Sequence, residues 1–306
     1  MPLYAGFDLG GTHLKYGLID NSGSTVYHSK KDSPLKILDL IQLIEKILKD
    51  LSEGDKYSIS SVGFGFPGVL SKKEKKIHQS PNYPDIDQFD LVPALSRFIK
   101  VPFTINNDAN MAAFGEYKMG AGQGVHSMVL LTIGTGLGTG IILEGKIWQG
   151  VCGFGGELGH AAVHTNGESC NCGSRGCLES EVSAPKIVKN YNLLNPLDQL
   201  TDAAQVYEKA LSGEKTARDA FSMAGRYLGI GLSIAINLLN PEKILLGGGV
   251  MKAGDFLVKP AIQEAQKRSF KAGFDCCRIE SATLGNHAGF IGSAFYAKEI
   301  GGRKID

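Results

Sequence analysis

Apolar and polar residues alternate along two stretches of the chain, and a glycine turn interrupts each stretch. Residues 3–20 predict a β-hairpin around Gly10 and Gly11, and residues 127–145 predict a second hairpin of the same design. The two copies correspond at three pairs: Asp8 with Thr132, Gly10 with Gly134, and Ile19 with Leu143. This weak internal repeat predicts two similar α/β domains, each presenting a glycine hairpin to a cleft between them.

Other segments follow helical or strand periodicity. A stripe of apolar residues at helical spacing predicts a helix in which Ser33 is the N-cap, Pro34 is the first residue and Gly54 marks the end; the stripe is Ile37, Ile41, Ile44, Leu48 and Leu51. Residues 101–120 predict a strand, a polar turn and a helix. The C-terminal part predicts a long buried helix over 217–241, a buried strand over 243–250 and a closing helix over 287–300.

Composition narrows the class of protein. The chain has 306 residues, 40 glycines and a formal net charge of +1, so charge gives no reason to expect nucleic acid or an anionic membrane as a partner. The N-terminus does not resemble a signal peptide, and no stretch reads as the roughly 18 apolar residues of a membrane span. These features predict a cytoplasmic protein.

The segment CNCGSRGCLE, residues 170–179, carries the most specific chemistry. Its C-x-C-x4-C spacing supplies three thiolates for a tetrahedral zinc ion, with His160 as the fourth ligand and His164 as the competing choice. A redox site would favour C-x-x-C, and a disulfide would leave an odd cysteine in a compartment where disulfides are rare. The remaining cysteines, Cys152, Cys276 and Cys277, are expected to be ordinary buried thiols.

Three further motifs suit a nucleotide phosphate site. In DLGGT, residues 8–12, a carboxylate that could hold Mg²⁺ precedes small glycines whose backbone amides could bind phosphate. GTGLGTG offers a second such turn, and LGGGV at 246–250 would let a flat base lie against backbone. Neither a Walker P-loop nor a Rossmann fingerprint is present. Asn107 and Asp108 follow a predicted strand, where they could bind a ligand or merely cap the next helix.

DLGGT, NNDAN, the double-glycine hairpin, GELGH and CNCGSRGCLE occur in the order and spacing of the ROK family, which comprises bacterial sugar kinases and related sugar-responsive repressors. The resemblance covers the whole chain and is greatest to glucokinase-type enzymes. It implies the actin-like ATPase fold, an α/β architecture with two ribonuclease-H-like lobes around a central cleft. The expected lobes are residues 1–118, with 289–306 packing back on them, and residues 119–288, which include a zinc loop over 160–179.

The resemblance also implies roles for individual residues. Asp108 matches the catalytic base. The residues that match sugar ligands are Asn82, Asn107, Asp108, Glu157, His160 and Glu179. The zinc ligands are His160, Cys170, Cys172 and Cys177. The expected ATP and Mg²⁺ contacts are Asp8, Gly10, Gly11, Thr12, Gly134, Thr135, Gly136 and Gly248. Many members have lysine at position 13, where this chain has histidine, so His13 and Lys15 receive no phosphate role.

The implied activity is ATP-dependent phosphorylation of a hexose, with glucose as the first choice, by a homodimer that carries structural zinc. A kinase for N-acetylmannosamine, N-acetylglucosamine, fructose or allose is the nearest alternative. A sugar-sensing regulator is an alternative of another class, although such relatives carry a DNA-binding domain ahead of DLGGT and only seven residues precede Asp8 here. A zinc-ribbon interaction module would not explain the glycine turns.

Overall fold

The computed structural model describes residues 1–53, 57–71, 76–78, 80 and 83–300. The chain forms two compact units. Unit 1 comprises residues 1–124, 140–156 and 284–306, and unit 2 comprises residues 125–139 and 157–283. The described residues form two five-stranded sheets, and the division between the units falls within one strand of the second sheet, β9 (Leu137–Leu143).

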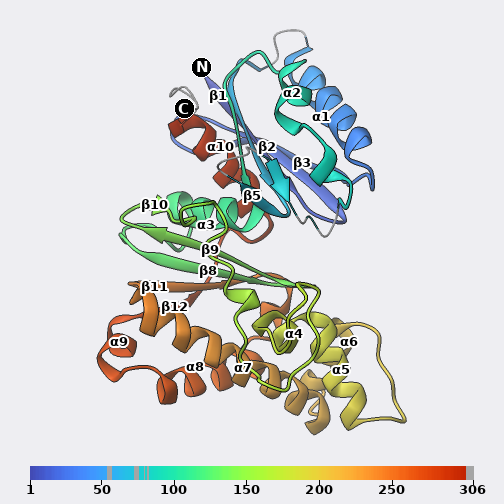
Figure 1. Cartoon of the computed structure of the whole chain (residues 1–306), viewed down its shortest axis with the longest axis vertical. Coiled ribbons are helices and arrows are strands. Elements are labelled where there is room, and N and C mark those ends of the chain that lie inside the picture. The colour runs from blue at the N-terminus through green and yellow to red at the C-terminus, as the bar shows by residue number, and fades with distance from the viewer. Residues whose placement is uncertain (54–56, 72–75, 79, 81–82, 301–306) are drawn as a thin grey trace. The chain divides into compact units, whose positions relative to one another are not determined.

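The sheet of unit 1 has the strand order β3-β2-β1-β4-β7 (Figure 1). The strands are β1 (Leu3–Leu9), β2 (His13–Ile19), β3 (Thr25–Asp32), β4 (Ile59–Phe66) and β7 (Phe103–Asn107). Strands β1 and β2 pair antiparallel, with Tyr4 opposite Ile19 and Leu9 opposite Leu14, so the first predicted hairpin forms around the glycine turn. Strand β4 is parallel to both β1 and β7. A short hairpin of β5 (Val69–Ser71) and β6 (Lys76–His78) follows β4.

Helices cover both faces of this sheet. Helix α1 (Ile37–Ser52) and the short α2 (Leu91–Ser96) share one apolar core with the odd-numbered residues of β1, such as Phe7. The even-numbered residues face α10 (Ala288–Ile300), which packs beside α3 (Asp108–Met119). A Cβ atom on Gly6 would lie 1.8 Å from the Phe290 carbonyl oxygen, so glycine is what allows α10 to rest directly on β1.

The predicted start of α1 is wrong by three residues. Its N-cap is Lys36, which makes no side-chain cap, and neither Ser33 nor Pro34 belongs to the helix. The Ser33 hydroxyl lies 2.6 Å from the hydroxyl of Tyr83, a residue that is almost completely buried. This long-range contact takes the hydroxyl that a cap would have used. Gly54, the predicted end of the helix, lies outside the described residues.

The second sheet repeats the order of the first, with β10 (Lys146–Ile147), β9, β8 (Met128–Ile133), β11 (Lys243–Gly247) and β12 (Arg278–Ser281) side by side. Strand β11 runs parallel to β8 and to β12. In both sheets an antiparallel hairpin is followed by two parallel strands, so the internal repeat and the prediction of two ribonuclease-H-like lobes are confirmed.

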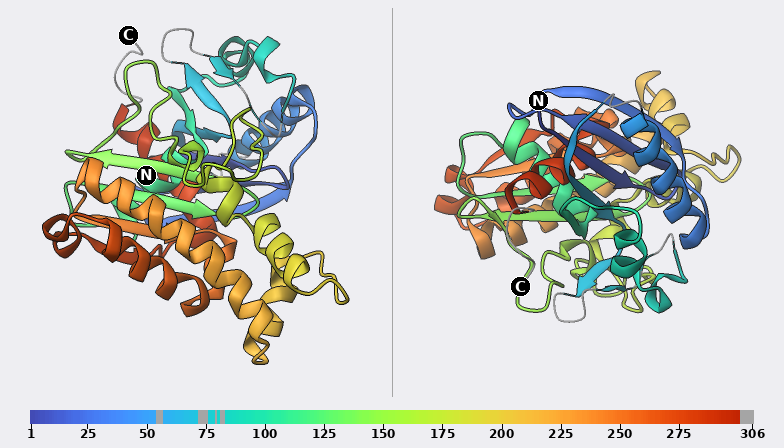
Figure 2. Two further views of the ribbon diagram at one scale, coloured as in Figure 1. Left: turned by 60° about the horizontal axis from the view of Figure 1, so that its bottom comes forward. Right: turned by 90° about the horizontal axis from the view of Figure 1, so that it is seen from above.

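The helices of unit 2 gather around α7 (Lys215–Leu239), the predicted long helix. Its neighbours are α4 (Leu178–Val182), α5 (Ala184–Leu194), α6 (Ala203–Leu211), α8 (Asp255–Arg268) and α9 (Lys271–Cys276). Helices α7 and α8 run side by side (Figures 1 and 2), and a Cβ on Gly225 would lie 2.5 Å from the Leu257 carbonyl oxygen.

Helix α7 is also long and apolar enough to cross a membrane, by length and composition alone, contrary to the expectation that no such stretch exists. Half of its most apolar 18-residue window is buried inside the protein. Core helices of soluble proteins pass the same test, and the packing of α7 against α4, α5, α6 and α8 accounts for its apolar surface.

Candidate functional site

His160, Cys170, Cys172 and Cys177 meet in one cluster, with their ligand atoms all within 4.8 Å of one another. The Sγ atoms of Cys172 and Cys177 are 3.7 Å apart, and Cys170 Sγ lies 3.7 Å from His160 Nδ1. Zinc–sulfur bonds of about 2.3 Å and zinc–nitrogen bonds of about 2.0 Å in a tetrahedron imply separations of about 3.8 Å and 3.5 Å. The four residues therefore fit a zinc ion with little rearrangement.

The cysteines differ in how readily they would ionise before metal binds. Burial opposes ionisation of Cys170, yet hydrogen bonds from the Cys172 backbone and from Ser180 outweigh it and lower the thiol pKa to about 7. Burial and the two neighbouring cysteines raise the pKa of Cys177 to about 12.

The two ring nitrogens of His160 face different groups. Nδ1 is directed at Cys170, and Nε2 lies 4.0 Å from the Glu157 carboxylate. His164, the competing ligand in the sequence, is occupied elsewhere. Its Nδ1 lies 3.1 Å from both Glu181 Oε1 and the Tyr227 hydroxyl, and its ring stacks on the ring of Tyr227.

Glu181 contacts residues of the zinc loop, which comprises residues 160–179. Its side chain is completely buried, and it contacts Lys186 Nζ at 3.2 Å as well as the backbone N–H of Glu168 at 3.4 Å. Within the loop, Gly176 adopts φ +66°, and a Cβ there would lie 1.7 Å from the His164 carbonyl oxygen. Sequence reasoning missed this cluster because nothing in the local pattern distinguishes a buried glutamate on a short helix from an exposed one.

Two other carboxylates of unit 2 were predicted to bind sugar. Burial raises the pKa of Glu157, and the charge of Glu179 adds to this while His160 opposes it. Glu179 lies on α4, and its Oε2 accepts a hydrogen bond of 2.8 Å from the backbone N–H of Leu137. The zinc loop and α4 therefore bring His160, Glu157 and Glu179 to the same part of unit 2.

In unit 1, β7 runs directly into α3 without the predicted intervening turn. The capping role falls to Asn107, whose side chain accepts a hydrogen bond from Asn110 N at 3.1 Å and donates one to the Gly68 carbonyl at 2.9 Å. Asp108 is the first residue of α3, at the carboxyl end of a parallel strand. The Asn107 side chain thus caps α3, and the Asp108 carboxylate beside it accepts a 2.9 Å hydrogen bond from the Ala109 backbone N–H.

The first glycine hairpin borders an open hollow of about 650 Å³ in unit 1. Its lining includes Gly10, Gly11, Thr12, His13 and Lys15. Asp8 is ion-paired with Lys15 at 3.6 Å, and burial raises the Asp8 pKa although Lys15 opposes the shift. The backbone amides of the glycine turn at this hollow could bind phosphate, and the Asp8 carboxylate at the end of the adjoining strand could hold its metal ion.

The second hairpin and the triple glycine lie together in unit 2. Gly248 adopts φ +91°, and a Cβ on it would lie 2.3 Å from the Ile133 carbonyl oxygen, so this position requires glycine. A Cβ on Gly134 would meet nothing within 4 Å, whereas one on Gly136 would lie 2.6 Å from Glu179 Oε2. Thr135 between them is exposed.

Comparison with known proteins settles the family. The profile described as "ROK family" matches residues 4–300. The chain belongs to the ROK family. It is 36% identical to a glucokinase of Halalkalibacterium halodurans, over 97% of this chain and 95% of that protein. A ROK glucokinase of Streptomyces griseus, solved with glucose and AMPPNP, superposes with a TM-score of 0.82 at 29% identity, covering 97% of this chain and 99% of that one.

The same ROK fold also serves regulators. A ROK transcriptional regulator described as a homologue of the E. coli MLC protein has a TM-score of 0.86 at 25% identity, and the match covers 98% of this chain and 78% of that one. The fold is therefore shared by both classes, and only the side chains of the site can separate them.

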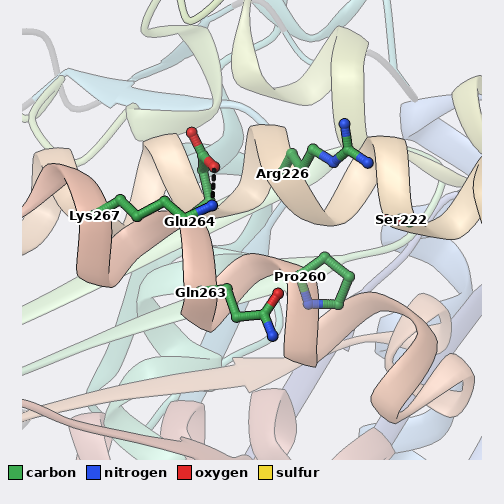
Figure 3. A pocket seen from close by; sticks show the side chains of 6 residues that line it. All are labelled: Ser222, Arg226, Pro260, Gln263, Glu264 and Lys267. Atoms are coloured by element: carbon green, nitrogen blue, oxygen red, sulfur yellow. Dashed lines mark ion pairs between the residues drawn. The ribbon is translucent and has the colours of Figure 1, made fainter.

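Some predictions made from the sequence are untested or wrong, and one hollow lies apart from the predicted site. Asn82 lies outside the described residues. Cys152 and Cys276 are exposed and Cys277 is half-buried, so the expectation of three buried thiols is wrong; Cys276 ends α9, a helix with no fully buried residue. A second hollow, of about 270 Å³, lies on α7 and α8 (Figure 3), and none of the predicted site residues lines it.

Proposed function

We propose that this protein transfers the γ-phosphoryl group of ATP to a hexose, with glucose as its preferred substrate. The nearly full-length similarity to glucokinases and to a structure that holds glucose with AMPPNP supports this substrate pair. The observation that carries the proposal is the placement of Asp108. It stands at the carboxyl end of β7, where open α/β sheets place ligands, and the neighbouring Asn107 already caps α3.

In the proposed reaction Asp108 accepts the proton of the sugar hydroxyl as its oxygen attacks the γ-phosphorus. A carboxylate suits this role because the proton is lost as the bond to phosphorus forms. Glu157, His160 and Glu179 bind ring hydroxyls, with Asn107 and Asn82 as further contacts. Asp108 belongs to unit 1, and Glu157 and Glu179 belong to unit 2.

The nucleotide phosphates are assigned to the glycine turns at Gly10–Thr12 and Gly134–Gly136, and the base to Gly248. Asp8 would hold the accompanying Mg²⁺, which neutralises phosphate charge when bound. Zinc would be held by His160, Cys170, Cys172 and Cys177. Because all four positions of a tetrahedron are then filled by protein, its role is to order the loop and leave Nε2 of His160 directed away from the metal.

The Asp108→Asn variant tests the mechanism. The amide keeps the size of the side chain but cannot accept the proton, so kcat should fall by about 10²–10⁴-fold. The fold should be unchanged, and sugar affinity should stay within about tenfold, or 1.4 kcal/mol. Turnover by a coupled ATP-consumption assay and sugar binding by calorimetry measure the two effects separately. Near-normal turnover would reduce Asp108 to a structural residue of α3.

A sugar-sensing role without catalysis is the second candidate, because a ROK regulator superposes on this chain. Binding of a hexose with no phosphorylation in the presence of Mg²⁺ and ATP would favour that role. We also propose a homodimer located in the cytoplasm with no nucleic-acid partner, which light scattering, cell fractionation and DNA-binding measurements can test.

A further inference from the structure

The backbone of Leu137 is held from two sides by segments that the proposed function assigns to the sugar. Its N–H donates a 2.8 Å hydrogen bond to Glu179 Oε2. Its carbonyl oxygen lies so close to Gly159 that a Cβ on that glycine would be 2.6 Å away. Leu137 is the first residue of β9 and directly follows the turn 134–136. The sugar-binding segments therefore contact the strand end that shapes this turn.

The turn itself depends on the same carboxylate. Gly134 N donates to the Gly136 carbonyl at 2.9 Å, which closes the turn, and Ala184 N donates to the Gly134 carbonyl at 2.8 Å. A side chain at position 136 would occupy the place of the Glu179 carboxylate, since its Cβ would lie 2.6 Å from Oε2. Glu179 lies within α4 and Ala184 is the first residue of α5, so one short segment, residues 179–184, contacts both ends of the turn.

We infer that Glu179 is a positioning residue for the phosphate hairpin 133–137 as well as a sugar ligand. One carboxylate oxygen fixes the Leu137 N–H, and the other is left to meet a sugar hydroxyl. This 2.8 Å hydrogen bond fixes the strand end that follows the turn, so its loss should loosen the hairpin. Nucleotide affinity then depends on Glu179 even when no sugar is present. This inference rests on the proposed function, because that function assigns the hairpin to nucleotide phosphates.

The test measures the affinity of the zinc-loaded protein for Mg²⁺–AMPPNP by calorimetry in the absence of sugar. Glu179→Ala should weaken AMPPNP binding about tenfold, which corresponds to about 1.4 kcal/mol. Glu179→Gln should restore binding to within about twofold, because the amide oxygen can still accept the Leu137 N–H. Both variants should raise the KM for the sugar. Glu179→Asp, which keeps the charge but shortens the side chain, should behave like alanine toward AMPPNP.

Glu157→Ala is the matched control. It removes another carboxylate of the proposed sugar site, which interacts with the side chains of His160 and Glu179. It should raise the sugar KM and leave AMPPNP affinity within about twofold. Equal AMPPNP affinities in Glu179→Ala, Glu179→Asp and the parent protein would overturn the inference, as would equal losses in Glu157→Ala and Glu179→Ala.

Failure of the proposed function would look different. A parent protein that binds AMPPNP but phosphorylates no hexose would overturn the proposed function. The AMPPNP affinities of the variants would then still decide the positioning role of Glu179. A parent protein without affinity for AMPPNP would overturn both. Zinc content and melting temperature, measured on every variant, separate a local effect on the hairpin from loss of the fold.

Discussion

Replacing Glu181 by glutamine alters a completely buried side chain that contacts the zinc loop and Lys186. The variant keeps the shape of the side chain but breaks the ion pair with Lys186, whose side chain is only 12% exposed. Removing one partner of a buried pair typically costs about 3–5 kcal/mol. Lys186 keeps a second partner, Glu168 at 3.4 Å, and the glutamine oxygen can still accept from the Glu168 N–H. These remaining contacts reduce the cost, so we expect a loss at or somewhat below the lower end of this range, about 2–3 kcal/mol.

For a unit of this size, such a loss should lower the melting temperature by roughly 4–12 °C. Thermal melts at equal zinc concentration, followed by circular dichroism, measure it. The matched control is Asp275→Asn, which breaks the Lys271–Asp275 pair in the same unit, where both side chains are more than half exposed. Exposed pairs contribute about 0–1 kcal/mol, so the control should change little.

A double variant separates the ion pair from the rest of the cluster. If Lys186 is the partner that matters, Glu181→Gln in a Lys186→Met background should cost clearly less than it does in the parent protein. Equal melting temperatures for Glu181→Gln and Asp275→Asn would refute the reasoning. They would show that the Glu181–Lys186 pair stabilises the fold no more than the exposed Lys271–Asp275 pair does.

Three further outcomes are expected. The purified protein should carry one zinc ion per chain, and Cys172→Ser should lose it and raise the KM for the sugar more than that for ATP; a metal-free, fully active preparation would contradict this. Hydrogen bonds from the backbone N–H groups of His126 and Ser127 lower the pKa of Glu242. The Glu242 carboxylate therefore stabilises the fold at neutral pH. This contribution disappears as the pH falls below 4.5 and through the folded-state pKa. Melting temperatures of the parent and Glu242→Gln should therefore differ at pH 7 and converge on acidification. In competition kinetics kcat/KM should be higher for glucose than for N-acetylglucosamine or N-acetylmannosamine, since an acetamido group leaves a hydroxyl-binding carboxylate unpaired; a higher value for either N-acetylhexosamine would overturn the substrate assignment alone.

The fold was predictable because its signals are local and repeated. Alternating apolar residues on both sides of a glycine turn specify a hairpin, and two copies of that pattern became the matching hairpins β1–β2 and β8–β9. The long helix α7 was equally clear from its periodicity. The start of α1 was not, because the Ser33 hydroxyl bonds to Tyr83, a residue 50 positions away that no local rule connects to it.

The candidate site shows the same limit. The cysteine spacing pointed to a zinc cluster, but His160 and His164 were both acceptable fourth ligands on sequence grounds. The choice between the two histidines depends on Glu181 and Tyr227, which bind the ring of His164. They lie 17 and 63 residues away from His164 along the sequence. The exposure of Cys152 and Cys276 was missed for a similar reason, since a cysteine is buried or exposed according to the tertiary packing of its segment.

Helix α4 explains why so many of these contacts converge. It has five residues, and isolated helices shorter than about 12–15 residues are marginal in water, so its conformation must come from tertiary contacts. Cys177, a candidate zinc ligand, is its N-cap residue, Glu181 is a completely buried residue within it, and the backbone N–H of Ala184 just beyond it donates to the Gly134 carbonyl. A bound metal would fix the position of Cys177. Because Glu179 lies between Cys177 and Ala184, a change that loosens either end of α4 should disturb both the proposed sugar contact and the Leu137 hydrogen bond. A zinc ion bound by the four candidate ligands would therefore influence the proposed phosphate hairpin through this helix without approaching the nucleotide.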